Sequence, residues 1–588
     1  MSKYSPSKKI IERSPNPEVF TQAQRLGVSP LLSRIIANRL KSTDNLQSII
    51  TPKLQHLQSP NELLNADQAA RLIADAIEST GTIVLATDYD TDGVTSAWVA
   101  HTALIDFFGV PSTRIEQVIG ERKTGYGITD EVVERILAIN DVTLVISADQ
   151  GSSDEARIAR LKQAGIPVVV TDHHQLPMEG PPPSASCTVN PQQQGCQYDK
   201  TIAGCFVIFL VMTQVRQELI HRGIIPAQSP SLKPLLKNVA LGTVADCVSL
   251  QSANNRAVVK TGLQQINTRS DAAWQAMYQL NDNQQQPYDA EFLGFQVATR
   301  INAASRVSDV TTAFKFLTAQ SLESAQFFLQ QLDEDNSNRK SQQNEMLLLA
   351  QTLAEELYHP KRYSLALKLQ GNAGIQGIIA SRIGEKYGVP TVAMTELEDG
   401  YLAGSGRGIV PEIDLRLAFQ TIADKYPELF KSMGGHSGAA GCMIKTQDYE
   451  LFRDEFELAI QQQLGEQAPQ PTVETDGTLH PSELNPHLIS ELSLLEPYGR
   501  EWPRPVFSGR FYVQQVRAVG ETKTHLSMKL MLDSQKPISA IYFNALDHAE
   551  AVWPFEQGDT IYCAYVPSLN SYQGYTNLQL RIETAYAV

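Results

Sequence analysis

Residues 161–174 have the sequence LKQAGIPVVVTDHH, and this stretch decides the fold that we expect. Its apolar run follows a helix-like segment and stops abruptly at Asp172, His173 and His174. A short Val-rich run after a helix predicts a buried strand of a parallel sheet. Open α/β sheets carry their sites at the carboxyl ends of such strands, and carboxylate with imidazole suits a divalent transition metal. A plain strand end, whose histidines cap the next turn, explains this stretch equally well when it is taken alone.

Three more apolar runs end at acidic residues. Residues 81–86 (GTIVLA) lead into Asp88, Asp90 and Asp92, and the run of residues 141–148 ends at Asp149. Residues 235–245 (LLKNVALGTVA) are predicted to form another strand, which ends at Asp246. Carboxylates so close together repel one another strongly unless a cation lies between them.

These four ends predict one shared site. The carboxyl ends of parallel strands meet at one edge of a sheet, so the acidic and imidazole groups are expected to converge there. Such a site suits two divalent ions, bridged by a carboxylate, that activate a water molecule and hold a phosphoryl oxygen. The mixed oxygen and nitrogen ligands favour Mn²⁺, two ions per site, over Mg²⁺, which prefers oxygen ligands.

Composition limits the class of protein. A chain of 588 residues predicts about three to four domains. The net charge of -15 disfavours a protein that coats nucleic acid, but clustered carboxylates that bind metal are compatible with a nuclease. We find no apolar run long enough for a membrane span and no secretory signal. Six cysteines without a Cys-x-x-Cys pair predict reduced thiols and a cytoplasmic location, with no membrane partner.

The four motifs, in this order, resemble the DHH phosphoesterase superfamily, and the long chain with its later motifs resembles the RecJ family of single-strand-specific DNA exonucleases. The resemblance extends from about residue 31 to the end of the sequence. It implies three catalytic residues: Asp172 orients a histidine, His174 either contacts the scissile phosphate or supports the metal ligands from behind, and Asp149 acts with the metals. Asp88 is expected to lie just behind the ligands, and Ala86 replaces a histidine of some members, which implies weaker binding of one ion. The metal ligands implied by the resemblance are Asp90, Asp92, Asp149, His173 and Asp246.

The same resemblance implies contacts to DNA phosphates. Arg122 lies in a basic loop before a predicted helix, a position that by itself suits a phosphate contact and a plain surface loop equally well. Residues 300–306 (RINAASR) match a family motif in which Ser305 replaces glycine. In the second half, a Gly-rich turn at 400–409 and a Gly-rich segment at 434–441 resemble a domain that binds the 5′ phosphate, although Gly371-Asn372 replaces a common Trp-His. Arginine suits such contacts because its planar fork matches phosphate. The expected phosphate-binding residues are Arg122, Arg300, Asn302, Arg306, Ser405, Arg407 and His436.

The fold class that we expect is α/β, with two α/β lobes joined by a long helix and followed by an all-β OB-fold. The N-terminal segment is expected to pack against the first lobe. In the OB-fold, contacts to single strands are considered at Trp502, Lys523, His525, Tyr572 and Tyr575, although a structural role is the simpler expectation for each. The expected domains are an N-terminal helical extension (1–60), a parallel-sheet DHH domain (61–320), a connector helix (321–358), a DHHA1 domain (359–465) and the OB-fold (466–588).

The resemblance implies a metal-dependent exonuclease that degrades single-stranded DNA from 5′ to 3′, releases 5′-mononucleotides and serves recombination and repair. The expected partners are single-stranded DNA, preferably with a 5′ phosphate, and a single-strand-binding protein, a helicase or another subunit. Two alternatives stay open. One is a phosphodiesterase of the same superfamily for short oligonucleotides or cyclic dinucleotides, which would lack the OB-fold. The other is a weakly active or non-catalytic DNA-binding scaffold within a larger complex.

Overall fold

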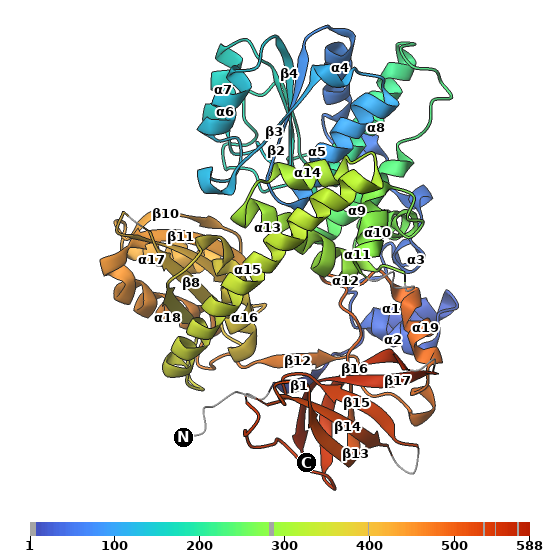
Figure 1. The fold of residues 1–588 in the computed structure, drawn as a ribbon, viewed down its shortest axis with the longest axis vertical. Helices are drawn as coiled ribbons and strands as arrows, with labels where there is room; N and C mark the ends of the chain where they lie inside the picture. Colours follow the sequence, from blue (N-terminus) through green and yellow to red (C-terminus); the bar gives the residue numbers. More distant parts are fainter. Residues whose placement is uncertain (1–7, 282–286, 398, 533–535, 547, 573–574) are drawn as a thin grey trace.

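The computed structural model describes residues 8–281, 287–397, 399–532, 536–546, 548–572 and 575–588. Two α/β lobes are bridged by one long helix, and a β-barrel follows them (Figure 1). This architecture confirms the predicted fold class. Among the helices of the described residues, none is both long and apolar enough to cross a membrane.

The first lobe is built on a five-stranded parallel sheet in the order β3-β2-β4-β5-β6. Helices α4, α5 and α8 share a core with one face of this sheet, and α6 and α7 pack on the other face. Burial on both faces explains the continuous apolar runs of the strands. The elements are α4 (Ala66–Glu78), β2 (Thr82–Thr87), α5 (Thr91–Thr102), β3 (Ile115–Ile119), α6 (Asp130–Leu137), β4 (Val142–Ala148), α7 (Glu155–Gln163), β5 (Val168–Thr171), β6 (Cys187–Val189) and α8 (Gly204–His221).

A layer of helices completes this lobe. One of them lies within residues 235–245, for which the prediction of a strand is wrong. Residues 236–245 of this run form helix α9 (Leu236–Ala245), with Asp246 as its C-cap. Because α9 is buried on nearly all sides, it is apolar all round, and such a segment shows no helical periodicity. Gly242 permits its close approach to α5, since a Cβ there would meet Thr95 Oγ1 at 2.3 Å. The other helices are α10 (Ala253–Ile266), α11 (Ala272–Leu280), α12 (Ala290–Phe292), α13 (Thr299–Val307) and α14 (Thr311–Leu317).

The predicted connector is a single helix, α15 (Leu322–Leu357), which leads into the second lobe (Figure 1). The sheet of that lobe has the order β10-β11-β9-β8-β7, in which only β7 and β8 are parallel. The predicted Gly-rich turn at 400–409 is wrong, because most of it forms the central strand β9. Its glycines allow dense packing, since a Cβ at Gly404 would meet Cys442 Sγ at 2.9 Å. The elements are β7 (Leu365–Leu369), α16 (Gln376–Tyr387), β8 (Thr391–Glu396), β9 (Tyr401–Arg407), α17 (Leu415–Lys425), β10 (Phe430–Gly435), β11 (Ala439–Lys445) and α18 (Tyr449–Leu464).

The C-terminal part forms a closed barrel in the order β13-β14-β15-β17-β16, as the five predicted runs suggested. Trp502 does not face solvent: its indole is fully buried, donates to the Leu495 carbonyl at 2.9 Å and lies under the Arg256 guanidinium. It is therefore a structural residue and no contact to DNA. The side chains of Tyr572 and Tyr575 lie outside the described residues. The strands are β13 (Phe507–Val519), β14 (His525–Met531), β15 (Ile538–Tyr542), β16 (Thr560–Tyr572) and β17 (Tyr575–Ala587).

The N-terminal segment joins the barrel as well as the first lobe. Strand β1 (Lys9–Glu12) pairs in parallel with β12 (Thr472–Thr475). Arg39 forms a buried ion pair with Asp476, with Nη1 at 2.7 Å from Oδ1. The expectation of packing against the first lobe alone was incomplete, because nothing local in the sequence marks a contact so distant along the chain. Four helices share one hydrophobic core with the barrel. They are α1 (Pro17–Arg25), α2 (Pro30–Ala37), α3 (Leu46–Ile50) and α19 (His487–Leu492).

Candidate metal centre and phosphate-binding cleft

Three carboxylates lie where β2 turns into α5. Asp90 is the N-cap of α5, and its Oδ1 accepts hydrogen bonds from the backbone N–H groups of Asp92 and Gly93. Both oxygens of Asp92 accept from backbone N–H groups at the start of α8, at 2.7 Å and 2.9 Å. A Cβ at Gly93 would meet the Asp88 carbonyl oxygen at 2.3 Å, so only glycine fits this turn. The helix N-termini therefore hold the carboxylates in place.

The ends of β4 and β5 supply the next group. Asp149 follows β4 with a φ of 60°, a left-handed backbone that aspartate tolerates better than most residues. Asp172 follows β5, and its Oδ2 accepts from Ser152 N–H at 3.1 Å. Its Oδ1 accepts from His173 N–H and from His174 Nδ1, both at 2.7 Å. Asp172 thus fixes the backbone and the ring of the histidine pair at the end of the strand.

The acidic groups from β4, α5 and the end of α9 converge on His173. Its Nε2 lies 3.2 Å from Asp149 Oδ1, 3.6 Å from Asp246 Oδ2 and 3.7 Å from Asp92 Oδ2. Three overlapping groups have ligand atoms within 4.8 Å of one another among the described residues. The first two share His173, and the third shares Asp149 with the first. These groups are Asp149/His173/His174, Asp92/His173/Asp246 and Asp88/Asp90/Asp149.

Burial and mutual repulsion perturb the acids of this cluster. Burial, together with the charges of neighbouring carboxylates, raises the pKa of Asp90 and raises those of Asp88, Asp149 and Asp246 well above the ordinary value. The protein therefore holds these acids in a state that a bound cation would relieve. Burial and the charge of His174 lower the pKa of His173, which favours the neutral imidazole that binds metal.

His174 has a different electrostatic setting. Burial acts to lower its pKa, but the charge and hydrogen bond of Asp172 outweigh this effect and raise the pKa to about 9. The Tyr126 hydroxyl donates to the Asp149 carbonyl at 2.9 Å, and its oxygen lies 2.8 Å from His174 Nδ1. Tyr126 was not singled out from the sequence, where only its glycine neighbours in a basic loop marked it. His174 is therefore a cationic, half-exposed group at the rim of the cluster.

The residues expected to bind phosphate divide into two sets. Asn302 is turned inward: its Oδ1 accepts from the Thr91 N–H and the Thr91 hydroxyl, each at 2.9 Å, and so holds the first turn of α5. Arg300 is buried and pairs with Asp333 of α15 at 2.8 Å. The structure does not bring these two side chains to the surface of the cleft described next. Their local sequence motif contained no sign of these partners.

A cleft of about 1010 Å³ lies between the two lobes. The Arg122 guanidinium lies 4.4 Å from the centre of the ring of Tyr89, the residue between Asp88 and Asp90. Arg306 donates to the Gly374 carbonyl of the second lobe. Burial and the charges of nearby arginines lower the pKa of Arg306 to about 10. Uncompensated arginines of this kind attract anions. Of the residues expected to bind phosphate, those that line this interlobe cleft are Arg122, Arg306, Ser405 and Arg407.

Ser405 and Arg407 point into the cleft from β9. Arg407 Nη1 donates to Ser405 Oγ at 3.1 Å, and both side chains lie against Gly377 at the start of α16, where a Cβ would meet Arg407 Nη2 at 2.4 Å. Burial lowers the pKa of Arg407. His436 lies at the turn between β10 and β11, where burial and the charges of Arg500, Arg407 and His174 lower its pKa.

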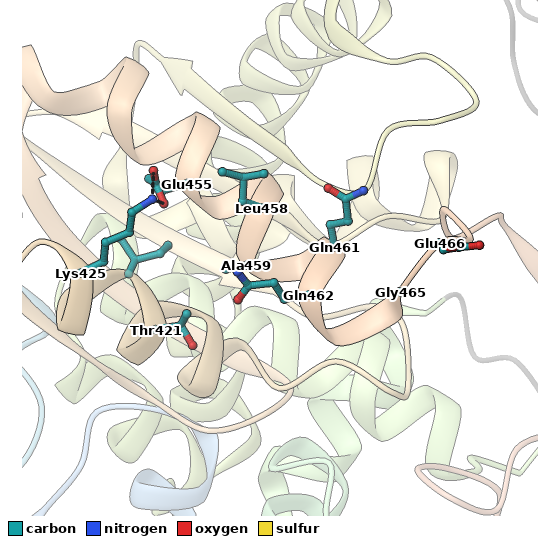
Figure 2. Close-up of a pocket in the computed structure, with 10 residues that line it drawn as sticks. Thr421, Lys425, Glu455, Leu458, Ala459, Gln461, Gln462, Gly465 and Glu466 are labelled. Carbon is teal, nitrogen blue, oxygen red and sulfur yellow. Dashed lines mark hydrogen bonds and ion pairs between the residues drawn. The ribbon is translucent and has the colours of Figure 1, made fainter.

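A second hollow lies elsewhere on the second lobe, between α17 and α18, with a volume of about 360 Å³ (Figure 2). Its charged lining consists mainly of the Lys425–Glu455 ion pair, which Figure 2 shows at one end of the hollow. None of the three potential metal-binding groups of the described residues lies there. The chemistry of the molecule is therefore concentrated at the edge of the first sheet.

The residues of this edge fit divalent metal. Asp88 Oδ1, Asp149 Oδ1 and His173 Nε2 are buried and make no hydrogen bond within the described part of the chain. Buried polar atoms are otherwise nearly always paired, so these three atoms indicate a missing partner. Carboxylate oxygens with a neutral imidazole nitrogen form a donor set suited to Mn²⁺.

Comparison with known proteins agrees with this geometry. Family models match at residues 82–243 (DHH family, N-terminal domain), 361–462 (DHHA1 domain) and 475–584 (RecJ OB domain). Fold and site thus define a DHH-type protein with a second DHHA1 lobe and an OB barrel. The single-stranded-DNA-specific exonuclease RecJ of Escherichia coli is 30% identical over 580 residues, which cover 95% of this chain and 96% of that protein. The chain therefore belongs to the RecJ family.

Two solved structures extend the comparison. The structure of RecJ in complex with Mn²⁺ from Thermus thermophilus matches with a TM-score of 0.77 and 23% identity, over 99% of this chain and 79% of that one. A structure of exonuclease RecJ bound to manganese matches with a TM-score of 0.56 and 26% identity, over 70% of this chain and 96% of that one. The first match supports the arrangement of all the domains of this chain, whereas the second extends over 70% of it.

Proposed function

We propose that this protein is a metal-dependent exonuclease that hydrolyses single-stranded DNA from the 5′ end and releases 5′-mononucleotides. The observation that carries the proposal is the convergence of Asp149, His173 and Asp246 with the acids of α5 at one sheet edge, beside a cationic cleft. Membership of a family whose relatives are named single-stranded-DNA-specific exonucleases supports the substrate. We further propose a place in DNA recombination and repair, as the resemblance to this family implies.

The ligands that we assign to the metals are the five residues expected from the sequence. Bound divalent ions, of which we propose two Mn²⁺, would activate a water molecule and stabilise the negative charge that develops on the phosphoryl group. Asp88, whose buried Oδ1 is unpaired among the described residues, lies close enough to Asp90 and Asp149 to join them. The proposed ligands are Asp90, Asp92, Asp149, His173 and Asp246.

Two further side chains have different roles: His174 acts on the DNA, and Asn302 acts on the metal ligands through another residue. His174 is held cationic by Asp172 and would hydrogen-bond a nonbridging oxygen of the scissile phosphate, where charge develops during hydrolysis. Asn302 acts through Thr91 and keeps the first turn of α5, with Asp90 and Asp92, in position. It is therefore a positioning residue.

The cleft supports the proposed 5′-to-3′ direction of digestion. Arg407 presents its guanidinium beside the Ser405 hydroxyl, a combination that suits the dianionic 5′-terminal phosphate. A strand whose 5′ phosphate is bound there, at a fixed distance from the metal centre, would be cut repeatedly near that end. We propose that Arg122 and Arg306 contact the DNA phosphates that lie between the bound 5′ phosphate and the metal centre. A single-strand-binding protein or a helicase would be the proteins that deliver such a strand.

The experiment uses a 30-mer labelled at its 3′ end, as a single strand or a duplex and with a 5′ phosphate or hydroxyl. In Mn²⁺ we expect a ladder of progressively shorter labelled strands together with unlabelled mononucleotides, faster digestion of the 5′-phosphorylated strand, and little digestion of the blunt duplex. A dinucleotide and a cyclic dinucleotide serve as competing substrates. Preference for these small molecules over the 30-mer, or absence of all cleavage in Mn²⁺ and Mg²⁺, would overturn the proposal.

A further inference from the structure

A loop that precedes the barrel lies directly on the loop that carries Asp246. We call residues 498–502 the barrel-leading loop. The backbone N–H of Leu250 donates to the Arg500 carbonyl at 3.0 Å, and Gln251 Nε2 donates to the Glu501 carbonyl at 3.1 Å. Arg500 Nη1 in turn lies 3.4 Å from the carbonyl oxygen of Cys247, the residue that follows Asp246. The barrel side of the molecule thus reaches the metal centre through this loop.

The barrel-leading loop is firmly placed. Trp502 at its end is fully buried under Arg256, and Gly499 and Trp502 form a backbone bridge. Gly499 packs so closely on the Asp246 side that a Cβ there would meet Leu250 Cδ1 at 2.7 Å. The position of the Arg500 backbone is therefore set by contacts on both sides, and only its side chain is free to adjust.

The charge of Arg500 has no acidic partner. Its side chain is exposed, and no carboxylate among the described residues lies within ion-pair distance of it. Its contacts to Leu250 and Cys247 place it beside the Asp246 end of α9. On the side of the second lobe, the charge of Arg500 is, after burial, the largest cause of the lowered pKa of His436.

We propose that Arg500 binds a backbone phosphate of the DNA strand beside the metal centre. The barrel-leading loop would thereby supply a DNA contact next to Asp246. The proposal deepens the proposed function and rests on it for the identity of the ligand. Among the described residues, the Arg500 side chain makes one hydrogen bond, to the Cys247 carbonyl, which uses one of its five N–H donors and leaves the rest of the planar fork for phosphate oxygens. An arginine that only supported Asp246 would have no reason to stay exposed and without a carboxylate.

The test compares Arg500→Ala and Arg500→Lys in the full chain, with Arg71→Ala as the matched control. Arg71 is also exposed, but it lies on α4 and pairs with Asp67, so its loss removes the same charge away from the site. Two measurements are made at several salt concentrations: kcat/KM on a single-stranded 30-mer in Mn²⁺, and fluorescence anisotropy of the labelled strand in Ca²⁺. Thermal unfolding and Mn²⁺ titration calorimetry complete the set.

For Arg500→Ala we expect KM to rise and strand affinity to fall about fivefold to tenfold, because one charged contact is lost. The slope of log affinity against log salt should decrease by about 0.7, the value for one phosphate of a single strand. Arg500→Lys should restore the salt slope and part of the affinity. The melting temperature and the Mn²⁺ affinity should stay unchanged, and Arg71→Ala should match the wild type throughout.

Two outcomes would overturn the inference. An unchanged salt slope with weakened Mn²⁺ binding would make Arg500 a support for Asp246 only. Wild-type values for Arg500→Ala in both the kinetic and the anisotropy series would make it an ordinary surface residue. The anisotropy series decides the matter even if no cleavage is found, whereas failure of the wild-type chain to cleave would count against the proposed function alone.

Discussion

Replacing Asp149 with asparagine should stabilise the metal-free protein while removing its response to metal. Ligand atoms of Asp88, Asp90 and Asp149 lie within 4.8 Å of one another. At an effective dielectric constant of ~20, two full charges at that separation repel by about 3 kcal/mol. The raised pKa values mean that protons already relieve part of this repulsion, so we expect a gain of ~1 to 2 kcal/mol in the free energy of unfolding.

Asparagine is the right substitute for three reasons. It tolerates the left-handed backbone at φ 60° that would cost alanine about 1 kcal/mol. It has the shape of aspartate, which matters because Gly204 packs directly on this side chain. Its amide can also donate to His173 Nε2, 3.2 Å away from Asp149 Oδ1. A lobe of this size should therefore melt ~2 to 8 °C higher in chelator, at about 2 to 4 °C per kcal/mol.

The assay is thermal unfolding, followed on the first transition, with chelator or with Mn²⁺. The wild type should gain about 2.7 kcal/mol per site when Mn²⁺ is at a hundred times its dissociation constant, and Asp149→Asn should gain far less. Asp130→Asn, an exposed acid at the start of α6, is the control and should retain the full response. A variant that melts below the wild type in chelator, or responds fully to Mn²⁺, would refute the electrostatic reasoning.

Three further outcomes follow from the same contacts. Asn302→Ala should lower kcat and Mn²⁺ affinity together and reduce stability by about 1 to 2 kcal/mol, because the Thr91 N–H loses its acceptor; calorimetry and unfolding check this. Arg407→Gln should abolish the advantage of a 5′ phosphate, measured as the ratio of kcat/KM for phosphorylated and hydroxyl strands, with the hydroxyl strand little affected. Asp476→Ala should destabilise the barrel by about 3 to 5 kcal/mol, because it leaves Arg39 buried without its partner; limited proteolysis and unfolding measure it.

Much of the site was predictable because its residues end apolar strands. Asp149 and the triplet beginning at Asp172 follow β4 and β5 directly, and the acids after β2 lie at the start of α5. In each case a hydrophobic run fixes the strand, and its end fixes the position of the polar group. Asp246 was placed correctly in the chain but on the wrong kind of element, since a helix buried all round has no polar face to reveal its period.

What the sequence could not provide is the partner of a side chain. Arg300 and Asn302 belong to one motif with Arg306, yet only Arg306 lines the cleft. Arg300 is neutralised by Asp333 of the long helix, and Asn302 turns toward Thr91. Such choices depend on which distant segments lie alongside, and no local pattern encodes them. The prediction of a turn at β9 was wrong for the same reason, because its glycines allow neighbouring strands to pack closely and do not form a turn.

The ion pair of Arg39 with Asp476 can form only late in the synthesis of the protein. The two residues are 437 positions apart, so at about 5 to 20 residues per second the ribosome needs roughly 20 to 90 s between them. During that interval the C-terminal end of α2 lacks the segment 476–503, to which Asn38 and Arg39 hydrogen-bond in the finished molecule. The core that buries Leu31, Leu32 and Ile36 therefore stays incomplete until that segment has been made, and a chaperone that shields this helix would be most needed before then.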